Sequence, residues 1–251
     1  MQTKTLAVYF ILLIVLCAGF VAGAKLMGQQ GAYLAQGYML SPAIAALLTR
    51  MFIYPLHFKD ANLRFGKVTD YVRFWLASLG IMALTFALYT ILGAVSWDLT
   101  GNVFLGRLAE QFALAGQSID DGLPPGMTPK MMLIIFFVGG LTIFNIPGVI
   151  TGFGEEFGHR GLMFPLLYQI KPWVAFVIGG LIWFAWHLPL MLIIPQTVEY
   201  PAWLTAVNFV VTAIGSVCTF IYLAYVYVKS RSVFVTAIAH IAMNNASMSL
   251  S

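Results

Sequence analysis

Long apolar runs dominate the chain, and short polar segments separate one run from the next. Seven runs are candidates for membrane-spanning helices: residues 5–25, 32–54, 72–97, 131–152, 173–194, 203–228 and 233–248. A spanning helix needs about 20 mostly apolar residues, and the last run is the shortest of the seven. Lipid cannot bond backbone N–H and C=O groups, and no barrel-like alternation is visible, so each run is expected to be helical. The pattern predicts an all-α protein, a polytopic transmembrane helical bundle of about seven to eight membrane helices.

The composition agrees with a protein that lies in lipid. Hydrophobic residues make up 61% of the chain and charged residues only 9%, whereas charged residues are roughly a quarter of a soluble domain. One such bundle uses all 251 residues, so we expect a single transmembrane domain, residues 1–251. The first run follows Lys4 and ends at Ala22-Gly23-Ala24, which resembles a signal-peptide cleavage site. Because the run is long for a signal peptide, an uncleaved first span is the preferred interpretation.

Basic residues predict the orientation in the membrane. The segment between the second and third runs carries Lys59, Arg64 and Lys67, with Arg50 and Arg73 near its ends. Basic loops stay in the cytoplasm. The next loop is net acidic through Asp98, Glu110, Asp120 and Asp121, and placing it outside puts Lys4, Arg160, Lys171, Lys229 and Arg231 inside. We therefore expect a multi-pass protein of the cell (inner) membrane of a prokaryote, with a cytoplasmic N-terminus. The net charge of +4 reflects this bias, so no nucleic-acid partner is expected.

Two further features are expected to be structural. In residues 98–130, five apolar residues recur at helical spacing, which predicts a short amphipathic helix on the outer membrane face; they are Phe104, Leu105, Leu108, Phe112 and Ala115. Cys17 and Cys218 both lie in apolar runs. Buried structural thiols are the expected role for both cysteines.

Two of the nine acidic residues stand side by side at the end of a long apolar run, in the stretch TGFGEEFGHRGL of residues 151–162. In a helix, Glu156 and Arg160 are four residues apart and can pair. Glu155 then points about 100 degrees away and is available for a cavity. A cluster of charges at the inner membrane edge is an equally good interpretation of this stretch alone.

Two later runs also contain polar residues that are costly in lipid. His187 lies in the aromatic stretch IWFAWHLP, residues 182–189. His240 and Asn244, four residues apart in AHIAMNN, share one helix face. Each of these could simply join helices by hydrogen bonds. Taken together with Glu155, they supply a general base, its orienter and two donors for an oxyanion, which is the set that hydrolysis of an amide by water requires.

These motifs resemble the CAAX prenyl-protease type 2 and bacteriocin-processing (CPBP) intramembrane glutamic endopeptidases. EEFGHR matches the family's E-E-x-x-x-R motif and HIAMN matches its H-x-x-x-N motif, while Trp183 stands where the family's F-x-x-x-H motif has Phe. The resemblance implies a helical bundle around an intramembrane catalytic cavity, with residues 131–251 as its motif-bearing core. It further implies that Glu155 and His187 activate water, that His240 and Asn244 stabilise the oxyanion, and that Glu156 and Arg160 have a supporting role.

The predicted spans conflict with this grouping of residues. Glu155 lies near the inner membrane edge in the predicted topology, whereas His187 lies 15 residues beyond Pro172, or roughly 22 Å along a straight helix. The two side chains can meet only if Glu155 lies well inside the membrane and the segment from Gly158 to Lys171 returns to the surface, or if the fifth span begins later than predicted. We give the motif grouping more weight than the span boundaries.

The preferred function is therefore an endopeptidase, with membrane lipid and a membrane-associated peptide or protein as partners and with no cofactor. One alternative is a zinc-dependent membrane metalloprotease with Glu155, His187 and His240 as ligands, although the chain lacks H-E-x-x-H. Another is a non-enzymatic membrane immunity or scaffold protein, and a third is a transporter with a buried proton relay. The sequence does not identify the substrate or show whether it is prenylated.

Overall fold

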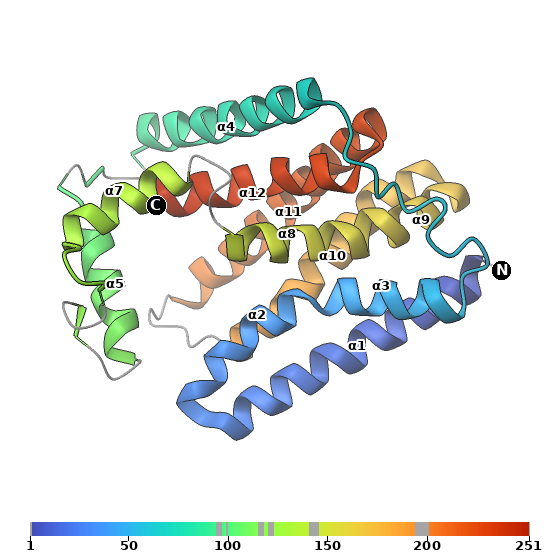
Figure 1. Ribbon diagram of the computed structural model, residues 1–251, viewed down its shortest axis with the longest axis horizontal. Coiled ribbons are helices and arrows are strands. Elements are labelled where there is room, and N and C mark those ends of the chain that lie inside the picture. Colours follow the sequence, from blue (N-terminus) through green and yellow to red (C-terminus); the bar gives the residue numbers. More distant parts are fainter. Residues whose placement is uncertain are drawn as a thin grey trace. The chain divides into compact units, whose positions relative to one another are not determined.

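The structure is a computed structural model that describes residues 2–93, 97–98, 100–114, 118–119, 123–140, 146–193 and 201–250. Every regular element in these ranges is helical (Figure 1). The α-helices are α1 (Gln2–Met27), α2 (Leu34–Met39), α3 (Ser41–Phe52), α4 (Val68–Ile91), α5 (Asn102–Leu114), α7 (Pro129–Gly140), α8 (Ile146–Gly158), α9 (Phe164–Ile170), α10 (Gly179–His187), α11 (Ala202–Ser230) and α12 (Val233–Leu250). Shorter 3₁₀ segments are η1 (Gly28–Tyr33) and η4 (Leu188–Leu192), and π-helical segments are η2 (His159–Met163) and η3 (Val174–Ile178). The predicted all-α class is confirmed.

The chain divides into two compact units. The first contains residues Met1–Phe74 and Pro147–Ala239, and the second contains Trp75–Ile146 and His240–Ser251. Four helical segments in the described ranges are long and apolar enough to cross a membrane: Gln2–Met27, Val68–Ile91, Val174–Leu192 and Ala202–Ser230. The predicted first, third, fifth and sixth spans correspond to them. The shorter apolar helices Ser41–Phe52 and Val233–Ala246 fall within the predicted second and seventh spans. The protein is an integral membrane protein.

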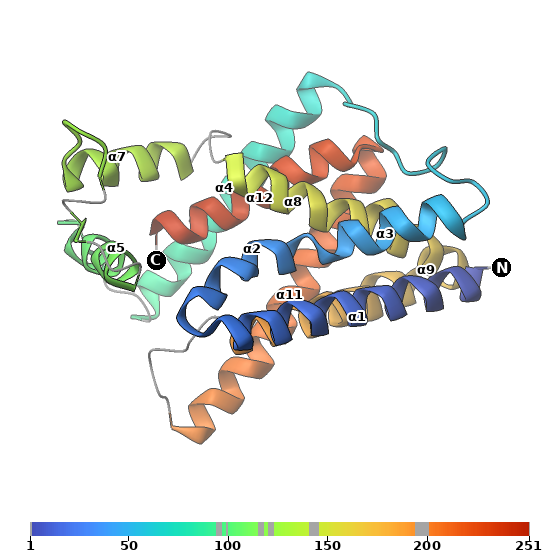
Figure 2. The same ribbon diagram turned by 60° about the horizontal axis from the view of Figure 1, so that its bottom comes forward.

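The predicted second span, residues 32–54, is not one continuous helix. It contains the end of η1 and the two helices α2 and α3, which are separated at Leu40. Pro42 lies in the first turn of α3, where its missing N–H costs nothing because that group has no partner in the helix. The break lets α2 and α3 follow α1 back along its length, as both views show (Figure 1, Figure 2).

The fourth predicted span ends too early at Gly152. Helix α8 continues to Gly158, and η2 and α9 follow it without interruption to Ile170. The chain then becomes extended at Lys171, with φ −156° and ψ 132°, and returns along η3 and α10 (Figure 1). Glu155 lies 16 residues before Lys171 and His187 lies 16 residues after it. The two side chains therefore come to the same level of a helical hairpin, which resolves the conflict in depth.

Glycines let α8 approach the start of α3 within the first unit. A Cβ atom at Gly158 would lie 2.4 Å from Cβ of Pro42 and 2.6 Å from its carbonyl oxygen, and one at Gly154 would lie 2.8 Å from Leu40. At Gly158 the crowding comes from the Pro42 ring and backbone, so a side chain there would push α8 away from α3, whereas at Gly154 the end of the Leu40 side chain would have to move. Helix α1 contributes Tyr9, Leu13 and Cys17 to the same buried core.

The second unit is small. Its α5 confirms a helix where the spacing in residues 98–130 predicts one. Asp98 precedes this helix, and its carboxylate accepts hydrogen bonds from the Thr100 side chain at 2.5 Å and from the Val103 backbone at 2.7 Å. These bonds lower the pKa of Asp98, with the Thr100 side chain as the largest cause. Ala115, Asp120, Asp121 and Ile194, which the sequence predictions also use, lie outside the described residues.

Candidate active site

The two adjacent carboxylates of α8 have different partners. Glu156 Oε1 lies 2.9 Å from Nη1 of Arg160, and both side chains are fully buried. Glu155 is 1% exposed, and its Oε2 accepts a hydrogen bond from Nε1 of Trp183 at 3.1 Å. The predicted pair of Glu156 and Arg160 is confirmed, and Glu155 points away from it, toward Trp183 of α10.

Arg160 joins α8 and η2 to the neighbouring helices. Its Nη2 donates to the backbone oxygen of Phe220 on α11 at 3.3 Å, and its Cζ lies 4.0 Å from the centre of the Phe220 ring. The Trp183 ring of α10 lies 5.6 Å from the same carbon. A desolvated cation is costly unless it is paired and hydrogen-bonded. Glu156, the carbonyl and the two aromatic faces supply those interactions.

His187, the last residue of α10, faces Glu155. Its Nε2 lies 3.7 Å from Oε2 of Glu155, and its Nδ1 lies 2.8 Å from the backbone oxygen of Trp183. A carbonyl only accepts, so Nδ1 carries the hydrogen and a neutral ring presents an Nε2 lone pair to the carboxylate. The His187 side chain is 33% exposed while that of Glu155 is 1% exposed. The imidazole is therefore the solvent-exposed member of the pair, and the carboxylate is the buried member.

Helices α2 and α3 hold Trp186, the residue before His187, a contribution that the sequence analysis missed. Trp186 donates from Nε1 to Oγ of Ser41 at 3.1 Å, and its backbone oxygen accepts from the Tyr38 hydroxyl at 2.5 Å. The Tyr38 ring stacks on Trp186 at 5.6 Å, and the ring of the fully buried His159 lies 5.4 Å away. The one available signal was a second Trp directly before His187. Segments outside the motifs thus fix the end of α10.

The sequence analysis also missed that Arg50 supports the candidate active site. The sequence analysis places Arg50 at the end of a basic cytoplasmic segment, yet the Arg50 side chain is fully buried. Its guanidinium donates twice to the backbone oxygen of Gly161 in η2, with Nε at 3.1 Å, and pairs with Oδ1 of Asp60 at 2.8 Å. Tyr54 donates to the other oxygen of Asp60 at 2.6 Å. Arg50 therefore fixes the π-helical turn that contains Arg160.

His240 and Asn244 lie on α12 in the second unit. Nδ2 of Asn244 lies 3.1 Å from Nε2 of His240. The carboxamide nitrogen can only donate, so Nε2 of His240 is the acceptor in this arrangement. His240 is 1% exposed, whereas Asn244 is exposed. The predicted common face of the two side chains is confirmed, and each predicted pair of catalytic residues is formed within its own unit.

No group of three or more His, Cys, Asp and Glu side chains that could hold a metal ion occurs in the part of the chain that the structure describes. The zinc alternative therefore gains no support from a ready-made ligand cluster. It remains a hypothesis with the ligands Glu155, His187 and His240.

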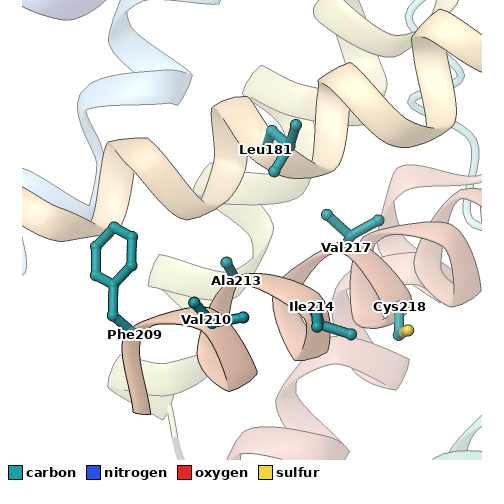
Figure 3. A pocket seen from close by; sticks show the side chains of 7 residues that line it. All are labelled: Leu181, Phe209, Val210, Ala213, Ile214, Val217 and Cys218. Atoms are coloured by element: carbon teal, nitrogen blue, oxygen red, sulfur yellow. The ribbon is translucent and has the colours of Figure 1, made fainter. Parts of the chain in front are cut away.

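An apolar groove lies between α10 and α11, apart from these residues. Its volume is about 280 Å³, and Figure 3 shows the seven side chains that line it: Leu181, Phe209, Val210, Ala213, Ile214, Val217 and Cys218. None of these supplies a carboxylate, an imidazole or an amide, and Cys218 is the one titratable side chain among the seven. Cys17 is buried as predicted, but Cys218 is exposed, because it faces this groove rather than the core.

Comparison with known proteins gives one family. The model of the type II CAAX prenyl endopeptidase Rce1-like family matches residues 127–246. The match begins before α7 and includes all six motif residues on α8, η2, α10 and α12. Comparisons with curated proteins and with solved structures gave no match. Residues 127–246, which carry all six motif residues, are therefore similar to the type II CAAX prenyl endopeptidases of the Rce1-like family.

Proposed function

We propose that the protein is an intramembrane endopeptidase in which Glu155 and His187 activate a water molecule. The observation that carries the proposal is the 3.7 Å separation of Glu155 Oε2 and His187 Nε2 in a chain similar to a CAAX-type protease family. Catalytic contacts are often long in the absence of substrate and shorten when it binds. A buried carboxylate beside a partly open imidazole suits a pair in which one group takes a proton and the other orients it.

In the proposed reaction, Glu155 removes a proton from water while His187 orients the pair. The hydroxide oxygen attacks the carbonyl carbon of the peptide bond, and the carbonyl π electrons move to oxygen to form a tetrahedral oxyanion. The oxyanion then collapses, the C–N bond breaks, and the proton passes to the leaving nitrogen. The products are a carboxylic acid and an amine, so atoms and charge balance without a covalent enzyme intermediate.

His240 and Asn244 are proposed to stabilise the oxyanion. The contact of 3.1 Å between the Asn244 carboxamide and the His240 ring supports a shared task, because it uses one amide hydrogen and orients the other. A donor aimed at charge that develops only in the transition state lowers the barrier more than it strengthens substrate binding. The role of Asn244 is therefore donation, with His240 as its partner.

The proposed substrate is a membrane-associated peptide or protein. The family description names CAAX prenyl endopeptidases, so a peptide with a C-terminal S-prenylated CAAX sequence is the first probe to use. The proposed topology keeps the N-terminus and the segment between α3 and α4 in the cytoplasm. Single cysteines placed at Lys4 and Lys59 in a variant without Cys17 and Cys218 would then react with impermeant maleimides only in inverted vesicles.

The test uses purified protein in lipid vesicles and two internally quenched CAAX peptides of one sequence, with and without an S-farnesyl group. Cleavage of either peptide, with the new termini found by mass spectrometry, is the expected result. His187→Ala should abolish it, whereas His57→Ala should not, because that exposed imidazole lies outside the candidate active site. Failure to cleave both peptides, or equal cleavage by His187→Ala, would overturn the proposal.

A further inference from the structure

Position 183 departs from the family motif in a way that changes the chemistry around Glu155. The motif has Phe at this place, and this chain has Trp183. The indole Nε1 donates to Oε2 of Glu155 at 3.1 Å, and both side chains are buried, at 6% and 1% exposure. A Phe ring has no hydrogen-bond donor. The substitution therefore adds a direct contact to the carboxylate that the proposed function makes the base.

Trp183 also contacts the other member of the pair. Its backbone oxygen accepts from Nδ1 of His187 at 2.8 Å, and its ring meets the imidazole edge-on at 5.0 Å and 87°. The oxygen of Glu155 that accepts from the indole is the one 3.7 Å from Nε2 of His187. A single residue thus fixes the imidazole through its backbone and the carboxylate through its side chain.

Glu155 has a competing electrostatic partner. Arg160 follows Glu155 by five residues in the same helical run, and it forms its ion pair with Glu156 at 2.9 Å. The Trp183 ring, 5.6 Å from Cζ of Arg160, lies against the same cation. A glutamate side chain has several rotatable bonds, and a buried carboxylate is stabilised by a charged partner, so without a fixed donor Glu155 is free to turn toward Arg160. The indole N–H opposes that rotation.

We propose that Trp183 is a positioning residue that holds Glu155 toward His187 and away from Arg160. This inference rests on the proposed function for its catalytic consequence, whereas the hydrogen bond itself is independent of activity. It predicts that Trp183→Phe, which restores the residue of the family motif and keeps an aromatic ring, moves Glu155 out of line with His187. Misalignment of a catalytic group by about 1 Å can cost roughly 100-fold in rate.

The hydrogen bond is tested without any substrate. Protein labelled with ¹⁵N-tryptophan has six indole N–H groups, and the NMR signal that disappears in Trp183→Phe belongs to Trp183. That signal should lie downfield in the wild type and move upfield in Glu155→Leu, which removes the acceptor. The Trp186 indole bonds to Ser41 and serves as the control signal that stays in place. An unchanged Trp183 signal in Glu155→Leu would overturn the inference.

The positioning role is tested by kinetics on the farnesylated and unmodified CAAX peptides. Trp183→Phe should lower kcat roughly 10- to 100-fold with little change in KM, while Trp173→Phe, at an exposed position, should change neither. In the Glu155→Asp variant the shorter side chain no longer reaches the indole, so adding Trp183→Phe should lower kcat much less than it does in the wild type. A full additional loss in that background, or a Trp183→Phe enzyme with wild-type kcat, would refute the positioning role. If the wild-type protein cleaves neither peptide, the proposed function is refuted. The NMR experiment would then still show whether Trp183 donates to Glu155.

Discussion

Glu155 Oε2 lies 3.7 Å from His187 Nε2, although the two residues are 32 positions apart in the chain. Their proximity follows from one turn. The helical segment from α8 to α9 ends at Ile170, the chain turns at Lys171, and η3 and α10 return, so residues equally far from the turn come to the same level. The two groups are thus presented from two helices, which hold catalytic side chains more rigidly than loops do.

Breaking the buried pair of Glu156 and Arg160 should destabilise the protein strongly. Arg160→Leu or Glu156→Gln leaves one fully buried group without its charged partner, which costs about 3–5 kcal/mol in the free energy of unfolding. Thermal unfolding in detergent measures the effect as a lower Tm. Lys4→Gln at an exposed position is the control and should change stability by less than about 0.5 kcal/mol. Unchanged melting of both pair variants would contradict a structural role for this pair.

Arg50→Lys should also lower the Tm, although the positive charge is kept. The guanidinium donates to Gly161 and Asp60 at once, and the single ammonium of lysine does not reproduce that planar set of donors. Loss of a buried hydrogen bond of this kind costs about 1–3 kcal/mol. Arg73→Lys, at an exposed position on α4, is the matched control. Equal melting of the two variants would show that the contacts of Arg50 do not support the π-helical turn.

Asn244 distinguishes an oxyanion donor from a hydrogen bond between helices. If its carboxamide donates to the oxyanion, Asn244→Ala should lower kcat by roughly 10² to 10³ with substrate binding nearly intact. Loss of an ordinary interhelical bond would cost only about 0.6 kcal/mol in stability. Asn244→Asp keeps the shape but can place negative charge against the oxyanion, so it should be at least as inactive. A folded Asn244→Asp enzyme with near-normal kcat would exclude the donor role.

Removal of metal ions separates the proposed mechanism from the zinc alternative. If Glu155 acts as the base, protein dialysed against a chelator and shown by elemental analysis to lack zinc should keep its cleavage activity. A zinc enzyme would lose its activated water with the metal. Loss of activity on chelation, with recovery on adding zinc but not magnesium, would establish the alternative.

The long apolar helices were predictable because length and hydropathy determine them, and α1, α4 and α11 confirm this. The fourth span was not, because the charges at Glu155, Glu156 and Arg160 were expected to end it. They do not end it, since Arg160 neutralises Glu156 and Trp183 bonds to Glu155 inside the bundle. The spacing of four residues predicts the pair of Glu156 and Arg160, whereas the bond to Glu155 from Trp183 on another helix cannot be read from local composition. The burial of Arg50 was missed for the same reason, because its partner carbonyl at Gly161 lies 111 residues away.

Steady-state cleavage of the CAAX peptides by Glu155→Gln tests the central claim most directly. The amide keeps the size of the side chain and can still accept from Trp183, but it cannot take a proton from water. Loss of general-base catalysis costs roughly 10² to 10⁴ in rate, so kcat should fall by that factor while the Tm stays close to that of the wild type. A folded Glu155→Gln protein that cleaves the peptides at a near-normal rate would show that Glu155 is not the base.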